Sequence, residues 1–125
     1  MPEVVKKILL IDDYKVSRDL LQGLLAERGL MVHSAKDGED GLKLAFEDKY
    51  DLILIDLILP RLSTFSVVET MLKPPLALPV DRIAILYTVG SEEMLEPVRE
   101  LGVRKFVLKS TVDQKKLIGE IISYL

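Results

Sequence analysis

The stretch D-L-I-L-I-D-L-I-L-P, residues 51–60, is a short apolar run that is interrupted by Asp56 and stopped by Pro60. A run this short, rich in isoleucine and ended by proline, is typical of a strand buried on both faces rather than of a helix. Asp51 lies at the entrance of this strand and can reach water. Asp56 interrupts the run itself, so its carboxylate must emerge at the carboxyl end of the strand or carry a large desolvation cost. The position of Asp56 therefore requires a functional explanation.

The composition indicates one globular domain and excludes several kinds of site. The chain has 125 residues, of which 49% are hydrophobic and 30% charged, which is enough to build and cover one core. The net charge of −3 gives no broad attraction to nucleic acid or anionic membranes, so we expect no direct nucleic-acid binding. With no cysteine and only one histidine, His33, the chain lacks disulfides, thiolate chemistry and a histidine-rich metal site. Its chemistry must use carboxylates, hydroxyls and lysine.

We expect a cytoplasmic protein with no membrane segment. The apolar run at residues 8–11 follows two lysines, but it is shorter than the roughly 7 to 15 residues of a signal-peptide core. No other stretch approaches the roughly 18 apolar residues of a membrane span. We also expect residues 1–125 to form a single domain that no output domain follows.

Strand-like and helix-like patterns alternate along the chain. Short apolar runs predict strands at residues 7–11, 31–34, 52–55, 83–87 and 104–108. Helical periodicity predicts helices at residues 17–28, after Asp37-Gly38, and at 64–73, 91–101 and 112–124. Pro97 predicts that the fourth helix is short or kinked, because an interior proline costs about 3 kcal/mol. The alternation predicts an α/β fold in which helices cover both faces of a parallel sheet.

Four of the five predicted strands deliver a polar group at the same end. These groups are Asp12 and Asp13, then Asp56, Thr88 and Lys109. In an open parallel sheet, ligands bind outside the carboxyl ends of the strands. We therefore expect these side chains to converge in one crevice.

Three carboxylates in one crevice favour a bound cation, because without one they repel and raise each other's pKa. Mg²⁺ takes oxygen ligands and is commonly shared with a phosphate. The predicted ligands are Asp13, Asp56 and the backbone carbonyl of Ile58, with Asp12 in support.

Asp56, at the centre of this group, is then the natural nucleophile toward phosphorus. Carboxylates form aspartyl-phosphate intermediates, so a phosphoryl group is a reasonable substrate. Lys109 and the metal are expected to neutralise the transferring oxygens, and Thr88 to donate a hydrogen bond to one of them.

The sequence resembles the receiver domains of two-component response regulators, including stand-alone receivers of the chemotaxis type, over essentially its whole length. The motifs that carry the resemblance are the Asp12-Asp13 pair, D-L-x-x-P with Asp56 and Pro60, Thr88, Gly102, Phe106 and Lys109. The resemblance implies a flavodoxin-like, doubly wound fold with five helices and strand order 2-1-3-4-5.

The resemblance also implies a function. A sensor histidine kinase or phosphotransfer protein would phosphorylate Asp56, and the domain would change shape through Thr88 and Phe106. Self-phosphorylation and autodephosphorylation would be its only reactions. We expect an unknown downstream protein to bind the face formed by the fourth helix, the fifth strand and the last helix.

The chain departs from the family pattern at three places. Ser63-Thr64 replaces the usual Asp-Gly, and because a β-branched threonine lacks the backbone freedom of glycine, we expect a different loop after Asp56. Val89 replaces a smaller residue, which predicts a narrowed path to the site and slower phosphorylation or hydrolysis. Ser110 stands where many relatives have a cis-linked proline, and a cis bond before serine costs roughly 2.5 to 4 kcal/mol.

Two other functions remain open. The departures from the pattern are compatible with a pseudo-receiver that binds a partner without phosphorylation. A small phosphohydrolase with an aspartyl nucleophile is the third possibility, although such enzymes place D-x-D after the first strand, whereas here the two aspartates are adjacent. We expect His33 to be structural or solvated, and Lys115 and Lys116 to form a solvated helix face.

Overall fold

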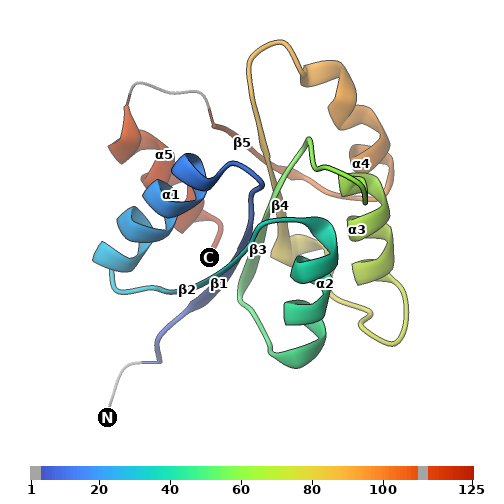
Figure 1. The fold of residues 1–125 in the computed structure, drawn as a ribbon, viewed down its shortest axis with the longest axis horizontal. Helices are drawn as coiled ribbons and strands as arrows, with labels where there is room; N and C mark the ends of the chain where they lie inside the picture. The colour runs from blue at the N-terminus through green and yellow to red at the C-terminus, as the bar shows by residue number, and fades with distance from the viewer. Residues whose placement is uncertain (1–3, 110–112) are drawn as a thin grey trace.

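A computed structural model describes residues 4–109 and 113–125 and shows a parallel sheet between two layers of helices (Figure 1). Its strands are β1 (Lys7–Ile11), β2 (Met31–Ala35), β3 (Leu52–Asp56), β4 (Ile83–Tyr87) and β5 (Lys105–Leu108). Its α-helices are α1 (Lys15–Glu27), α2 (Gly38–Glu47), α3 (Thr64–Leu72), α4 (Glu96–Glu100) and α5 (Gln114–Ser123), and its 3₁₀ helices are η1 (Val80–Arg82) and η2 (Glu92–Leu95). The strand order β2-β1-β3-β4-β5, with every pair parallel, confirms the predicted flavodoxin-like sheet.

The opening stretch of the sequence forms the central strand, β3, whose five residues are all buried. Helices α1 and α5 cover one face of the sheet, and α2, α3 and α4 cover the other (Figure 1). Leu52 and Leu54 belong to the core beneath α1 and α5, whereas Ile53 and Ile55 belong to the core on the opposite face. Because β3 is packed on both faces, its apolar run is continuous rather than alternating.

The predicted elements are all present, with shifts of one or two residues at several ends. Helix α1 begins at Lys15 rather than residue 17, and β5 begins at Lys105 rather than residue 104. The short fourth helix is confirmed: Pro97 lies in the first turn of α4, where its missing N–H is tolerated, and η2 precedes that turn. The predicted start of the last helix at residue 112 and the bond between Lys109 and Ser110 lie outside the described residues.

Among the described residues, no helix combines the length and the apolar content that crossing a lipid bilayer requires.

Gly41 lets α2 lie directly against β1. A Cβ atom at this position would lie 2.3 Å from Ile11 Cδ1 and 2.7 Å from Ile11 Cγ1. We expect Gly41→Ala to lower the free energy of unfolding by about 1–3 kcal/mol, because Ile11 is fully buried and must shift. Urea denaturation measures this change.

Gly23→Ala is the matched control, because a Cβ atom on Gly23 in α1 would meet nothing within 4 Å. This substitution is expected to raise the free energy of unfolding by about 0.5–1 kcal/mol through helix propensity. A neutral Gly41→Ala variant would contradict the close packing of α2 on β1.

Candidate functional site

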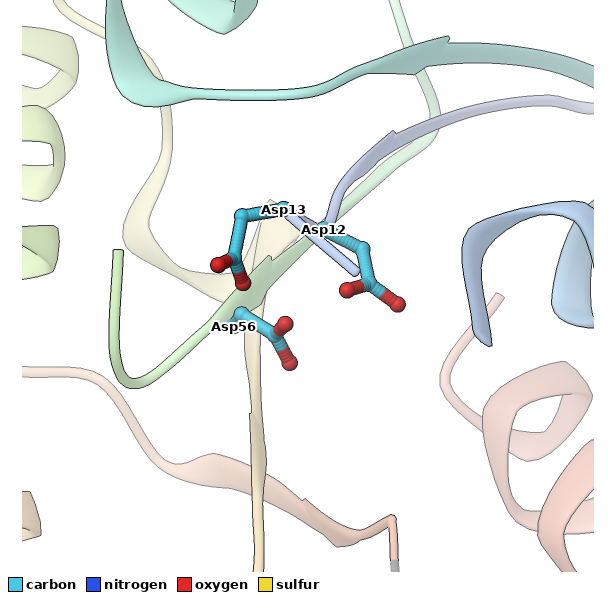
Figure 2. Close-up of side chains that lie close together, drawn as sticks. All are labelled: Asp12, Asp13 and Asp56. Atoms are coloured by element: carbon cyan, nitrogen blue, oxygen red, sulfur yellow. The ribbon is translucent and has the colours of Figure 1, made fainter. Parts of the chain in front are cut away.

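Three carboxylates meet at the carboxyl ends of β1 and β3 (Figure 2). Oxygen atoms of Asp12, Asp13 and Asp56 lie within 4.8 Å of one another. The sheet register explains this arrangement: Ile11 pairs with Ile55, so the residues that follow, Asp12 and Asp56, emerge side by side. Asp12 is 0% exposed and Asp56 is 7% exposed, whereas Asp13 faces solvent. The convergence predicted from the strand ends is therefore present.

Lys109 reaches this cluster from the end of β5 and contacts two carboxylates. Its Nζ lies 2.9 Å from Asp12 Oδ2. The same atom donates to Asp56 Oδ1 at 3.0 Å and to Asp56 Oδ2 at 2.9 Å. The Lys109 backbone N–H donates to the Tyr87 carbonyl at 2.6 Å, which fixes the end of β5 to β4. The sequence predicted a role for Lys109 near phosphoryl oxygens; the structure adds its ion pair with Asp12.

The two buried carboxyl groups have opposite pKa shifts. The pKa of Asp56 is raised to about 8, chiefly by burial and then by the neighbouring Asp12, while Lys109 acts in the opposite direction. Burial also raises the pKa of Asp12, but hydrogen bonds with Asp56, Ser17 and Lys109 outweigh it and leave this pKa below its usual value. Burial lowers the pKa of Lys109, yet hydrogen bonds and charge from the two carboxylates raise it overall. Asp12 and Lys109 thus form the charged pair, and Asp56 is the carboxyl group that is most costly to ionise.

A cavity of about 180 Å³ opens at this end of the sheet. The residues that line it are Asp13, Tyr14, Asp56, Leu57, Ile58, Leu86, Tyr87, Thr88, Ser91 and Lys109. Asp12 is not among these lining residues. Val89 is 70% exposed and is not among the lining residues, so the structure does not show the predicted narrowing by this side chain.

Three hydroxyl groups whose roles were not predicted from the sequence donate hydrogen bonds to residues at the carboxyl ends of the strands. Ser17 donates to Asp12 Oδ2 at 2.6 Å, Thr64 to the Asp56 carbonyl at 2.5 Å, and Ser91 to the Thr88 carbonyl at 2.6 Å. Each hydroxyl comes from the start of the helix that follows its strand. In the sequence, each of these residues is a serine or threonine near the start of a helix. Such residues are common there for helix capping, so the sequence did not distinguish them.

In the loop between β3 and α3, the residue with an unusual backbone conformation is not Thr64. Thr64 is the first residue of α3, and Ser63 caps this helix by accepting from the Ser66 N–H. As a helical residue, Thr64 needs no glycine-like backbone freedom. That the loop differs from the family's stays a prediction. The positive φ in this loop belongs instead to Arg61, at 62°. The Arg61 guanidinium contacts Asp37 at 3.1 Å, which ties the loop to the start of α2.

The remaining residues that the sequence singled out lie away from the cavity. Phe106 is half-buried, and the Arg99 guanidinium lies 5.0 Å from the centre of its ring. His33 contacts the Tyr50 hydroxyl at 2.9 Å through Nδ1, which supports a structural role. Lys115 and Lys116 are exposed on α5, as predicted.

Comparisons of sequence identify relatives of this chain. It matches the response regulator receiver domain family over residues 8–122. The transcriptional regulatory protein DltR of Streptococcus agalactiae is 36% identical over 105 residues, which are 82% of this chain and 45% of that protein. Protein PilH of Pseudomonas aeruginosa is 26% identical over 121 residues, which are 95% of this chain and 97% of PilH. The chain thus spans less than half of DltR but nearly all of PilH.

Solved structures support the same assignment. The chemotaxis response regulator CheY4 of Vibrio cholerae has a TM-score of 0.84 at 23% identity, with 98% of this chain and 100% of that chain covered, which shows the shared fold. The response regulator TrrA of Thermotoga maritima, solved in complex with Mg²⁺-BeF, has a TM-score of 0.77 at 25% identity, with 97% and 100% covered. The chain therefore belongs to the response regulator receiver domain family, a signalling family of two-component systems.

Proposed function

We propose that this receiver accepts a phosphoryl group on Asp56 from the phosphohistidine of a sensor histidine kinase or phosphotransfer protein. The observation that carries the proposal is the Asp56 carboxyl group, which lines a small cavity and contacts the Lys109 ammonium. In the proposed reaction, an Asp56 oxygen attacks phosphorus, the phosphorus–nitrogen bond breaks and the histidine leaves. Signalling would then occur through protein–protein contacts, in the cytoplasm.

The donor set fits Mg²⁺, because three carboxylates converge at this end of the sheet. Asp13, Asp56 and the backbone carbonyl of Ile58 would hold the ion, with Asp12 in support. The bound ion would supply positive charge beside the phosphoryl oxygens.

Two side chains on the other strands would assist the transfer. The Lys109 ammonium, already within hydrogen-bond distance of both Asp56 oxygens, would neutralise charge on the phosphoryl group. Thr88 also lines the cavity, and its hydroxyl would donate a hydrogen bond to a phosphoryl oxygen. We propose that movement of Thr88 and rotation of Phe106 carry the resulting change toward α4, β5 and α5, where a downstream protein would bind.

The phosphate donor protein would approach over α1. Tyr14, Val16 and Leu20 are large apolar side chains on this side that are 62%, 65% and 46% exposed. All three side chains line a groove of about 240 Å³ between α1 and α5. Tyr14 and Lys109 line both this groove and the Asp56 cavity. An apolar surface that continues into a reactive site suits a protein donor.

Phosphorylation can be tested by incubating the protein with Mg²⁺ and acetyl phosphate and then measuring the intact mass. We expect one added phosphate in the wild-type protein and none in Asp56→Asn, which lacks a nucleophilic carboxylate. Asp51→Asn is the matched control, because Asp51 lies just before the opposite end of the same strand and accepts a hydrogen bond from the Lys7 N–H at 2.8 Å. This control is expected to retain the adduct.

The same experiment separates the other two functions. No adduct with either acetyl phosphate or a phosphorylated kinase would contradict the proposal and support a phosphorylation-independent receiver. Sustained turnover of a phosphate ester would instead support a phosphohydrolase.

A further inference from the structure

We propose that Thr64 is a positioning residue for Asp56, an inference that rests on the proposed function of Asp56. Thr64 is 2% exposed, and its hydroxyl donates to the Asp56 backbone carbonyl at 2.5 Å. This hydrogen bond joins the last residue of β3 to the first residue of α3. Thr64 thus contacts the main chain of the proposed phosphoryl acceptor and acts on the carboxylate only through it.

The hydrogen bond closes the base of the loop that follows Asp56. Residues 57–63 leave β3 and return at Thr64, and this segment includes Ile58, which lines the cavity. Asp56 and Thr64, at the two ends of the loop, are both buried, so their hydrogen bond is shielded from water. In such surroundings a hydrogen bond is strong, and the loss of its donor leaves a carbonyl poorly satisfied.

The second tie of this loop lies at the surface. Arg61 contacts Asp37 at 3.1 Å, but the Arg61 side chain is 68% exposed. The Asp37 side chain is only 8% exposed, so solvent competes mainly for the Arg61 guanidinium, and that competition weakens the hold of the pair on the loop. Of these two ties, the Thr64 hydroxyl is the buried one and the one that contacts Asp56 itself.

The carboxylate of Asp56 has a restricted set of useful orientations. It must remain within reach of Lys109 Nζ, now 2.9 Å away, while it also stays close to Asp13, which offers an oxygen within 4.8 Å. A tilt of the strand end would move it relative to both groups. Small displacements of a reacting group lower rates steeply, by about 100-fold for 1 Å. We therefore assign the Thr64 hydroxyl the task of fixing the strand end at the correct tilt.

Three variants test this assignment by the rate of phosphorylation with saturating acetyl phosphate and Mg²⁺. Thr64→Val keeps the shape and removes the hydroxyl, so we expect a maximal rate about 5- to 10-fold lower, with little change in the half-saturating donor concentration. Thr64→Ser keeps the hydroxyl and is expected to stay within about twofold of wild type. Thr70→Val is the control. The Thr70 hydroxyl donates to the Ser66 carbonyl at 2.8 Å, and this hydrogen bond lies within α3 instead of joining α3 to β3.

A folded Thr64→Val protein with the wild-type rate would overturn the assignment, as would equal losses in Thr64→Val and Thr70→Val. If Thr64→Val does not fold, Thr64→Gly replaces it, since glycine also lacks the hydroxyl and is the residue usual in the family. An unchanged rate in that variant would equally overturn the assignment.

A second readout separates failure of this inference from failure of the proposed function. In protein without Mg²⁺ or donor, the ¹³C resonance of the Asp56 side-chain carboxyl should move in Thr64→Val and return in Thr64→Ser. If wild type takes up no phosphate but this pattern is present, the proposed function fails and the positioning role stands. If the resonance is the same in all variants, the positioning role fails whatever the phosphorylation result.

Discussion

Lys109→Met is expected to lower the free energy of unfolding by about 3 kcal/mol near pH 8, because it leaves two buried carboxylates without their shared cation. Lys109 Nζ lies 2.9 Å from an oxygen of Asp12 and 2.9 Å from an oxygen of Asp56. The three side chains are 15%, 0% and 10% exposed, respectively, so water would compensate only poorly for the lost ammonium. Urea denaturation at several pH values measures the effect, and phosphorylation should be lost in the same variant.

The pH dependence of the stability loss in Lys109→Met shows whether the loss comes from the missing charge or from changed packing. At pH 5 Asp56, with its pKa of about 8, is protonated in both proteins, and Asp12 takes up a proton more readily once Lys109 is removed, so the loss in Lys109→Met should shrink to about 1 kcal/mol. A second substitution, Asp56→Asn in the Lys109→Met background, removes one of the two orphaned carboxylates and should restore part of the stability.

A surface lysine provides the control. Lys15→Met breaks an ion pair with Asp19 whose side chains are 76% and 57% exposed, and it should change stability by less than about 0.5 kcal/mol. A loss in Lys109→Met that is the same at pH 5 and pH 8 would show that packing, not charge, explains the effect.

The sheet could be predicted from sequence because its signals are local. The apolar run of residues 52–55 is long enough for one strand and too short for a helix, and it forms the buried centre of β3. Pro97 likewise identified a short α4, since the effect of proline on a helix depends on its own backbone. The carboxylate cluster followed from one rule, that parallel strands bring their carboxyl ends to the same edge.

The supporting contacts could not be predicted because they depend on side-chain directions between distant elements. Lys109 and Asp12 are 97 positions apart, and their ion pair depends on how far a flexible side chain extends from β5. Thr64 appeared to be a conflict because the family pattern has glycine there; only the structure shows its hydroxyl beneath Asp56. The left-handed backbone of Arg61 had no sequence signal, since positive φ is expected of glycine or asparagine.

Asp56→Asn is expected to stabilise the protein in EDTA, by about 3–5 kcal/mol at pH 8. The pKa of Asp56 is raised from 3.8 to about 8, chiefly by burial and then by Asp12. A raised pKa means that the folded state binds the proton more tightly than the unfolded state does. The stabilisation by the neutral carboxyl group is therefore complete below pH 3.8 and is lost as the pH rises toward 8. Asparagine does not titrate, so its advantage should grow between pH 5 and pH 8 and then level off.

Equilibrium urea denaturation of both proteins at pH 5, 7, 8 and 9 tests this trend, with Asp51→Asn as a control at an exposed position. A stability difference that is constant across this range would contradict the raised pKa of Asp56.

Mg²⁺ should reduce the stability advantage of Asp56→Asn over the wild-type protein. A metal ion binds the deprotonated carboxylate, so its binding to the wild-type protein must release a proton from Asp56 below about pH 8. Calorimetry in two buffers with different ionisation enthalpies should detect this proton, and the affinity for Mg²⁺ should rise with pH until Asp56 is ionised. Asp56→Asn lacks the anionic ligand, so it should gain less stability from Mg²⁺ than the wild-type protein does. The charge that destabilises β3 in EDTA would thus be the charge that the ion requires, and equal stabilisation of both proteins by Mg²⁺ would exclude Asp56 as a ligand.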